Sequence, residues 1–158
     1  MASWTDFERE AGDVAFRARA YLDGRRHKTI ATLRRSGSPR ITGTEVFFSG
    51  PDLWFGSMWH SQKALDLRRD PRFALHSGSE DPPDWRGDVS VSGRAIEVDD
   101  ALVKEAIARE LGSDSEEPWH LFRAELTEVV VVQLADSGSH LDIDIWNPGS
   151  EVKRVERA

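Results

Sequence analysis

The first 23 residues carry hydrophobic side chains at intervals of three and four positions, which is the spacing of one buried helical face. Thr5 or Asp6 can cap the start of this helix, and Gly24 ends the pattern. Two shorter helices are predicted over residues 61–70 and from residue 99 or 100 to about 111, because a capping side chain precedes each apolar stripe.

The rest of the hydrophobic pattern alternates or clusters in short runs bounded by turn residues, as in β-strands. The predicted strands cover residues 28–34, 40–48, 53–56, 73–76, 88–98, 122–134 and 141–146. Connections of hairpin length join the first three strands, so the sheet begins antiparallel. Within residues 88–98 the alternation changes phase near Gly93, which predicts a β-bulge or sharp bend there.

About seven strands and three helices indicate a mainly β (α+β) fold class. Long bent strands joined by short hairpins favour an antiparallel barrel, closed or nearly closed, with helices packed outside it. No internal repeat, low-complexity tract or domain boundary interrupts the chain, so residues 1–158 are predicted to form a single domain. Residues 1–24 provide its N-terminal helix, and residues 147–158 are predicted to be a charged tail.

The composition excludes several classes of function. A formal net charge of −7 argues against a nucleic-acid partner. The longest apolar run, residues 129–132, is far too short for a membrane helix, and the polar N-terminus does not look like a secretory signal. The absence of cysteine excludes disulfides, iron–sulfur clusters and thiolate metal sites. We therefore expect a cytoplasmic protein with neither a nucleic-acid nor a membrane partner.

Candidate chemistry gathers just after the strand at residues 53–56. Gly56 and Ser57 end that strand, where small side chains let a flat ligand approach the backbone. Ser61 then opens a helix whose free N–H groups favour an anion. Lys63 lies in the first turn of this helix, where a cation is unfavourable for the helix unless a phosphate binds there. Ser61 as a simple cap and Lys63 as a solvated surface residue explain the same spacing equally well.

Two other positions are candidates for ligand contact. Arg40 begins the preceding strand, where its planar guanidinium can reach the same anion; taken alone, an exposed charge after a turn is the simpler interpretation. Trp146 lies on the polar face of the last strand, opposite three aliphatic residues. A tryptophan outside the core often contacts a ligand or a subunit, although one lying flat on a sheet surface fits the pattern equally well.

Classical catalytic motifs are absent. The five histidines are scattered along the chain and form no i,i+4 pair: His27, His60, His76, His120 and His140. A metal or haem site would therefore have to be assembled from distant positions in the sequence.

The order of elements and three sequence blocks resemble the pyridoxamine 5′-phosphate oxidase-like flavin-binding split β-barrels. The blocks are R-I-T-G-T-E from Arg40, L-W-F-G-S-M-W-H from Leu53, and S-Q-K-A-L-D-L-R-R-D-P-R from Ser61, the last being the most specific. The resemblance extends from about Phe16 to Arg154. It implies an antiparallel split β-barrel with flanking helices and a homodimer. The cofactor would be FMN or the deazaflavin factor-420, held between the two barrels.

The resemblance also implies roles for individual residues. The implied cofactor-binding residues are Arg40, Thr42, Gly56, Ser57, Ser61, Gln62, Lys63 and Trp146. Gln62 stands where the family has an arginine, and Trp146 is expected to reach the cofactor of the partner subunit. Arg154 is the implied substrate-binding residue. The resemblance assigns no metal ligand.

Two departures from the family pattern bear on activity. Glu45 stands where the oxidase pattern has a phosphate-binding lysine, and Glu156 replaces the histidine of its C-terminal R-L-H motif. Weaker phosphate binding is therefore expected, and true pyridoxamine phosphate oxidase activity is not. Strand alternation places Glu45 on the other face of the strand from Thr42 and Thr44. Its carboxylate therefore either points away from a ligand on the threonine face or pairs with an arginine.

The expected function is that of a flavin- or deazaflavin-dependent oxidoreductase acting on a small molecule that the sequence does not identify. The absence of a catalytic side-chain cluster agrees with this hypothesis, because such cofactors supply the hydride chemistry themselves. The alternative is a non-catalytic protein that carries or senses FMN, deazaflavin or haem on the same fold. A homodimer is expected, with an exposed Trp146 buried in a two-fold interface.

Overall fold

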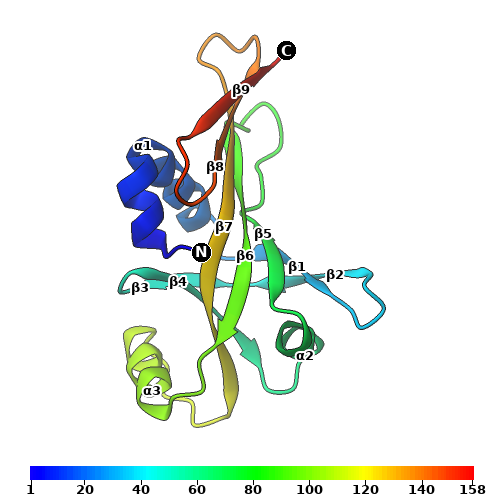
Figure 1. Cartoon of the computed structure of the whole chain (residues 1–158), viewed down its shortest axis with the longest axis vertical. Coiled ribbons are helices and arrows are strands. Elements are labelled where there is room, and N and C mark those ends of the chain that lie inside the picture. The colour runs from blue at the N-terminus through cyan, green and yellow to red at the C-terminus, as the bar shows by residue number, and fades with distance from the viewer.

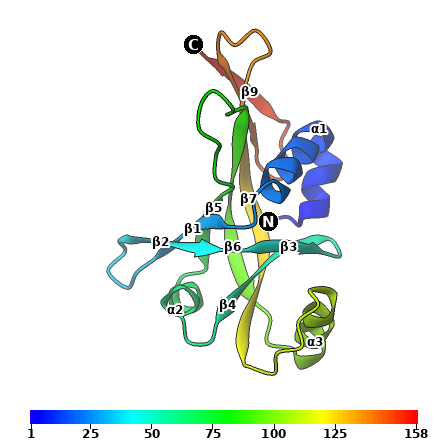
Figure 2. The same ribbon diagram turned by 180° about the vertical axis from the view of Figure 1, so that it is seen from behind.

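The computed structural model describes residues 1–158 and has three helices beside one antiparallel sheet of nine strands (Figures 1 and 2). The helices are α1 (Trp4–Asp23), α2 (Gln62–Arg69) and α3 (Ala101–Glu110). The strands are β1 (Lys28–Leu33), β2 (Pro39–Thr44), β3 (Val46–Ser49), β4 (Asp52–Met58), β5 (Arg72–His76), β6 (Gly87–Glu97), β7 (Trp119–Leu134), β8 (Leu141–Trp146) and β9 (Lys153–Arg157). The predicted mainly β class with flanking helices is confirmed.

The sheet is a barrel that does not close. Its strands follow the order β2-β1-β5-β6-β7-β4-β3, with β8 and β9 added beside β7. Residues 40–48, predicted as one strand, are divided at Glu45, because β2 pairs with β1 whereas β3 pairs with β4. The chain therefore leaves one ladder and joins another at the point where the barrel is split.

All three predicted helices are present, and each begins at a capping side chain. Ser61 caps α2 and Asp100 caps α3, as their positions predict. The cap of α1 is Ser3 rather than Thr5 or Asp6: Asp6 instead closes a capping box with Ser3. None of the helices combines the length and the apolar composition that a membrane span requires.

The bulge predicted near Gly93 is confirmed. The register between β6 and β7 shifts between Ser92 and Gly93. A side chain at Gly93 would overlap the carbonyl oxygen of Glu125, which explains why the chain has a glycine there. β7, the longest strand, extends from the lower part of the sheet beside α2 and α3 to the upper part beside α1 (Figure 1).

The interpretation of β8 from sequence is wrong about which face is covered. Trp146 is fully buried under α1, where its indole N–H donates to Glu10 at 2.9 Å and its ring lies 4.6 Å from that of Phe7. The alternation itself holds, but α1 covers the polar face. The three aliphatic residues on the other face are only half-buried: Leu141, Ile143 and Ile145.

The prediction of a charged tail over residues 147–158 is also wrong in part. Lys153–Arg157 form β9, which pairs with β8 at the edge of the sheet. The strand is held by Arg154, whose guanidinium bonds both carboxylate oxygens of Asp144 at 2.7 and 2.8 Å. Charged residues are usual on an exposed edge strand, so a charged sequence did not exclude one.

Candidate functional site

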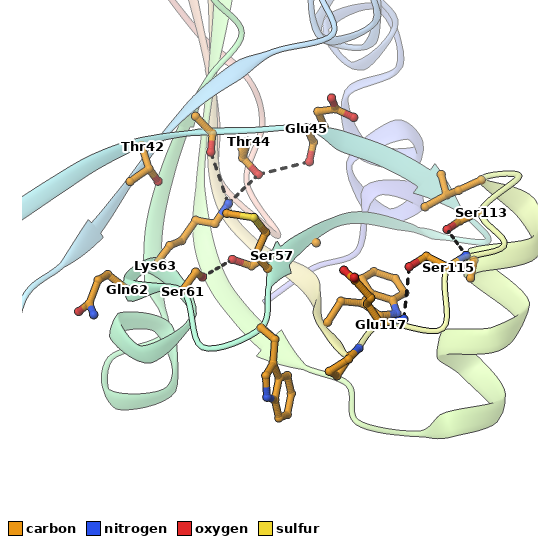
Figure 3. A pocket seen from close by; sticks show the side chains of 18 of the residues that line it. Thr42, Thr44, Glu45, Ser57, Ser61, Gln62, Lys63, Ser113, Ser115 and Glu117 are labelled. Atoms are coloured by element: carbon orange, nitrogen blue, oxygen red, sulfur yellow. Dashed lines mark hydrogen bonds between the residues drawn. The ribbon is translucent and has the colours of Figure 1, made fainter.

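The main pocket lies in the lower half of the molecule and has a volume of about 1200 Å³. On one side it is bounded by β2, β4 and the N-terminus of α2, and on the other by α3 and the loop that follows it (Figure 3). Seven of the eight residues predicted to bind a cofactor line it: Arg40, Thr42, Gly56, Ser57, Ser61, Gln62 and Lys63. Positions from three elements are thus brought together at one site.

The N-terminus of α2 opens into this pocket. The Ser61 hydroxyl accepts a hydrogen bond from the backbone N–H of Ala64 at 3.2 Å and also bonds to the Ser57 hydroxyl at the end of β4. These bonds fix the start of the helix relative to the strand. Gln62, the first helical residue, is exposed at the pocket. The result is a rigid helix end with free N–H groups beside small residues, an arrangement suited to an anion.

Lys63 is the main cation of the pocket and has no anionic partner. Its side chain is buried, with the residue 8% exposed, and its ammonium lies 3.2 Å from the Thr44 hydroxyl and 3.4 Å from the Gly43 carbonyl (Figure 3). Burial lowers the pKa of Lys63 below its ordinary value. A buried ammonium bonded only to neutral oxygens is unfavourable unless a ligand compensates it, so the site favours a bound anion.

Thr42 supplies a second unsatisfied group. Its hydroxyl oxygen is buried and has no hydrogen-bond partner within the protein, although Thr42 lines the pocket. Buried hydroxyl groups are nearly always bonded, and the few that are not call for an explanation. A ligand oxygen bound between Thr42 and Lys63 would satisfy both groups.

Arg40 lines the pocket, but part of its guanidinium is already bonded to another side chain of the protein. Its Nε donates to the Asp66 carboxylate at 2.7 Å, and Thr32 and Arg69 donate to the same carboxylate at 2.9 and 3.1 Å. Burial raises the pKa of Asp66, but these hydrogen bonds together bring it below its ordinary value. The other nitrogens of Arg40 bond no protein acceptor and are free for a ligand. Arg40 is therefore oriented, and partly neutralised, by a carboxylate that the sequence analysis did not connect with it.

The sequence left open whether the Glu45 carboxylate points away from the ligand face or pairs with an arginine, and the structure shows the arginine pair. Its exposed carboxylate pairs with Arg26 at 2.9 Å and lies 3.5 Å from His27. The side chain stands at the edge of the pocket, away from Lys63 (Figure 3). The negative charge is therefore matched by an arginine and does not cancel that of Lys63.

The wall of the pocket on the α3 side was not predicted from the sequence. Trp119, at the start of β7, lies against Gly56 so closely that a side-chain carbon at Gly56 would be 3.2 Å from the indole ring. Pro118 and Leu111 extend this apolar wall, and three polar residues edge it: Ser113, Ser115 and Glu117. The only sequence signal for this wall is a tryptophan at the junction of a loop and a strand. Nothing else indicates it, because tertiary contacts rather than local sequence bring the loop to the pocket.

Trp146 and Arg154 do not reach this pocket. They lie on β8 and β9, at the opposite end of the sheet from α2 and α3 (Figure 1). The premise that Trp146 is exposed is wrong, because the residue has no exposed surface, and its contact with a cofactor stays a prediction. Arg154 is bound to Asp144, and its contact with a substrate stays a prediction.

An antiparallel split barrel with a pocket at the start of α2 defines the class of protein. The family model described as Pyridoxamine 5'-phosphate oxidase matches residues 17–135, and the chain belongs to this family.

Solved structures with the same fold come from distant relatives. A pyridoxamine 5'-phosphate oxidase-related, FMN binding protein from Nostoc punctiforme is 15% identical, with a TM-score of 0.64 over 100% of this chain and 98% of that one. A heme binding protein from Mycobacterium smegmatis is 17% identical, with a TM-score of 0.62 over 83% and 56% of the two chains. A protein of unknown function from Agrobacterium tumefaciens is 22% identical, with a TM-score of 0.61 over 79% and 58%. This chain thus spans little more than half the length of the last two. No curated protein matches its sequence.

Proposed function

We propose that this protein binds FMN and acts as a flavin-dependent oxidoreductase on a small molecule. The observation that carries the proposal is the buried Lys63 ammonium without an anionic partner, beside the unsatisfied Thr42 hydroxyl and the open end of α2. FMN presents a phosphate to such a site and a flat ring to the small residues beside it. The FMN-binding relative from Nostoc supports this choice of ligand.

Each part of the pocket has a distinct task in this proposal. Lys63, Thr42 and the first N–H groups of α2 would hold the phosphate, with Arg40 oriented toward it by Asp66. Gly56 and Ser57 would leave room for the ring at the end of β4. The apolar wall of Trp119 and Pro118 would exclude water from the opposite side. Bound FMN supplies the hydride-transfer chemistry, while the protein binds, orients and shields.

Three alternatives share the fold. Factor-420 also carries a phosphate, so the anion site accommodates it equally well. A carrier or sensor would use the same contacts without turnover. Haem is less well supported, because no histidine, cysteine or tyrosine lines the pocket and Met58 is the only side chain there of a type that ligates haem iron.

Titration of the purified protein with each cofactor distinguishes these possibilities. We expect the protein to be colourless or partly loaded, to bind added FMN in the micromolar range or tighter, and to cause no saturable shift of the haem Soret band. Anaerobic reduction of the loaded protein by a substrate panel then separates an enzyme from a carrier. We expect little turnover of pyridoxamine phosphate. Absence of FMN binding, with saturable haem binding, would contradict the proposal.

We also propose a homodimer, on a surface different from the one the sequence suggested. The outward face of β7, β8 and β9 carries seven half-buried aliphatic residues that are not packed against the hydrophobic core: Val130, Val132, Leu134, Leu141, Ile143, Ile145 and Val155. The solvent face of an antiparallel sheet is normally polar. If a second copy of the protein packed the same face against it across a two-fold axis, both apolar faces would be buried.

Ile143, paired with Val132 on one side and Val155 on the other, is at the centre of this face. Ile143→Lys should convert a dimer of twice 17.8 kDa into a monomer, because an ammonium would be buried in the interface. Light scattering at micromolar concentration measures the change. Asp136→Lys, at the exposed β7–β8 turn, is the matched control and should stay dimeric. A parent protein that is already monomeric would refute the proposed interface.

A further inference from the structure

A chain of hydrogen-bonded side chains runs from the surface at Arg68 to the buried His120 ring behind the pocket wall. Arg68 on α2 donates to both carboxylate oxygens of Glu97 at 2.6 and 2.9 Å. The same carboxylate lies 2.6 Å from Nδ1 of His120 on β7. On the other side of this ring, Nε2 lies 3.1 Å from the backbone nitrogen of His60, whose N–H donates to it. The chain thus links α2, β6 and β7 to the turn that precedes Ser61.

These contacts determine the protonation of the His120 ring, which has no exposed surface. A backbone N–H can only donate, so Nε2 must be the unprotonated nitrogen, and Nδ1 carries the proton that it donates to Glu97. Hydrogen bonds from Arg68, and then from His120, lower the pKa of Glu97 and keep it an acceptor. The Nδ1–H form of His120 therefore gives both ring nitrogens a hydrogen-bond partner.

The turn at residues 58–61 needs such support. His60 is the only non-glycine residue with a positive φ, at 58°. This conformation is unfavourable for a residue with a Cβ atom and persists where its surroundings enforce it. Two contacts with the same ring do so: the hydrogen bond from His60 N–H, and the stacking of Trp59 on His120 at 4.6 Å with an interplanar angle of 15°.

The turn is also part of the pocket. Met58 and Trp59 line the cavity, and Ser61, the cap of α2, follows His60 directly. We propose that His120 is a positioning residue of the anion site: its neutral Nδ1–H imidazole holds the 58–61 turn, and through it the first turn of α2, in the ligand-binding conformation. The identity of the ligand in this inference rests on the proposed FMN function, whereas the support of the turn by His120 does not depend on it.

Two substitutions separate the hydrogen bond from simple packing. His120→Phe keeps a ring under Trp59 but removes the acceptor, whereas His120→Gln places an amide oxygen near the position of Nε2. Without ligand, the His60 amide should exchange with solvent at least tenfold faster in His120→Phe and at nearly the parent rate in His120→Gln. Nitrogen-15 shifts of the parent ring should show a protonated Nδ1 and a bare Nε2. A protonated Nε2, or equal exchange in all three proteins, would overturn the proposal.

Ligand affinity tests the positioning itself. His120→Phe should weaken FMN binding roughly three- to tenfold, the loss of one hydrogen bond, and His120→Gln by less than twofold. In a His60→Gly background the effect of His120→Phe should shrink, because glycine adopts the turn without strain. Additive losses would mean that His120 acts only as a core residue, which contradicts the inference.

Two further measurements cover the cases in which His120→Phe does not fold or the parent protein binds no FMN. If His120→Phe does not fold, Glu97→Leu should also speed His60 exchange, because His120 is then free to take the Nε2–H form. Unchanged exchange in that variant counts against the inference. If the parent binds no FMN, the proposed function fails, while His60 exchange still decides whether His120 holds the turn.

Discussion

Replacement of Lys63 by methionine should weaken FMN binding by one to two decades and leave the fold intact. The ammonium is the one buried cation of the pocket without a carboxylate partner, and a charge-assisted contact to phosphate contributes roughly 1.5–3 kcal/mol. Methionine has a similar length and fills the same space without the charge. Titration by flavin fluorescence measures the loss. Lys153→Met, on the exposed edge strand β9, is the matched control and should bind FMN like the parent.

The same variant should be at least as stable as the parent in the absence of ligand. Burial lowers the pKa of Lys63, so below that value the folded protein bears the cost of a buried charge, and the cost is relieved as pH rises toward the ordinary value of 10.5. Parent stability relative to Lys63→Met should therefore increase with pH in this alkaline window. Urea unfolding at several pH values measures the difference. An unchanged FMN affinity in Lys63→Met would show that the anion binds elsewhere.

Asp144→Asn should destabilise the protein by about 3 kcal/mol, the lower end of the range for breaking a buried ion pair, because one partner is half-exposed. The Asp144 side chain is 2% exposed and bonds Arg17 on α1 at 2.6 Å as well as Arg154 on β9. Its replacement removes the charge that both guanidinium groups share, although Arg17 keeps its bonds to Asp13 and Gln133, and it weakens the hold on both elements. Urea unfolding measures the change. Asp142→Asn, two residues earlier and bonded to His140 alone, should change stability by only about 0.5 kcal/mol.

The effect of Asp144→Asn should disappear in acid. Hydrogen bonds from Arg154, opposed by burial and assisted by Arg17, hold the pKa of Asp144 below its ordinary value of 3.8. A carboxylate with a lowered pKa stabilises the fold above its ordinary pKa, and this contribution is lost as pH falls through the lowered value. The two proteins should therefore converge in stability below about pH 4. A difference that does not shrink as pH falls below about 4 would exclude the ion pair as its source.

Local sequence signals predicted most of the elements and the part of the pocket around the start of α2. Helical spacing, capping side chains and strand alternation located three helices and the bulge near Gly93, because each depends on residues close together in the chain. Gly56, Ser61 and Lys63 belong to one strand–turn–helix segment, so their meeting at one pocket also followed from local order. Arg40 was a candidate from its position at the start of an earlier strand, and the family pattern added Thr42 on that strand.

The tertiary structure decided what depends on partners far along the chain. Alternation in β8 defines two faces, but only the position of α1, more than a hundred residues earlier, determines that Trp146 and Asp144 are covered. The pairing of Glu45 with Arg26 and the α3-side wall of the pocket likewise depend on how elements pack. Burial and charge pairing are properties of the assembled surfaces. A sequence pattern therefore identifies which residues share a face, whereas packing determines which face is buried.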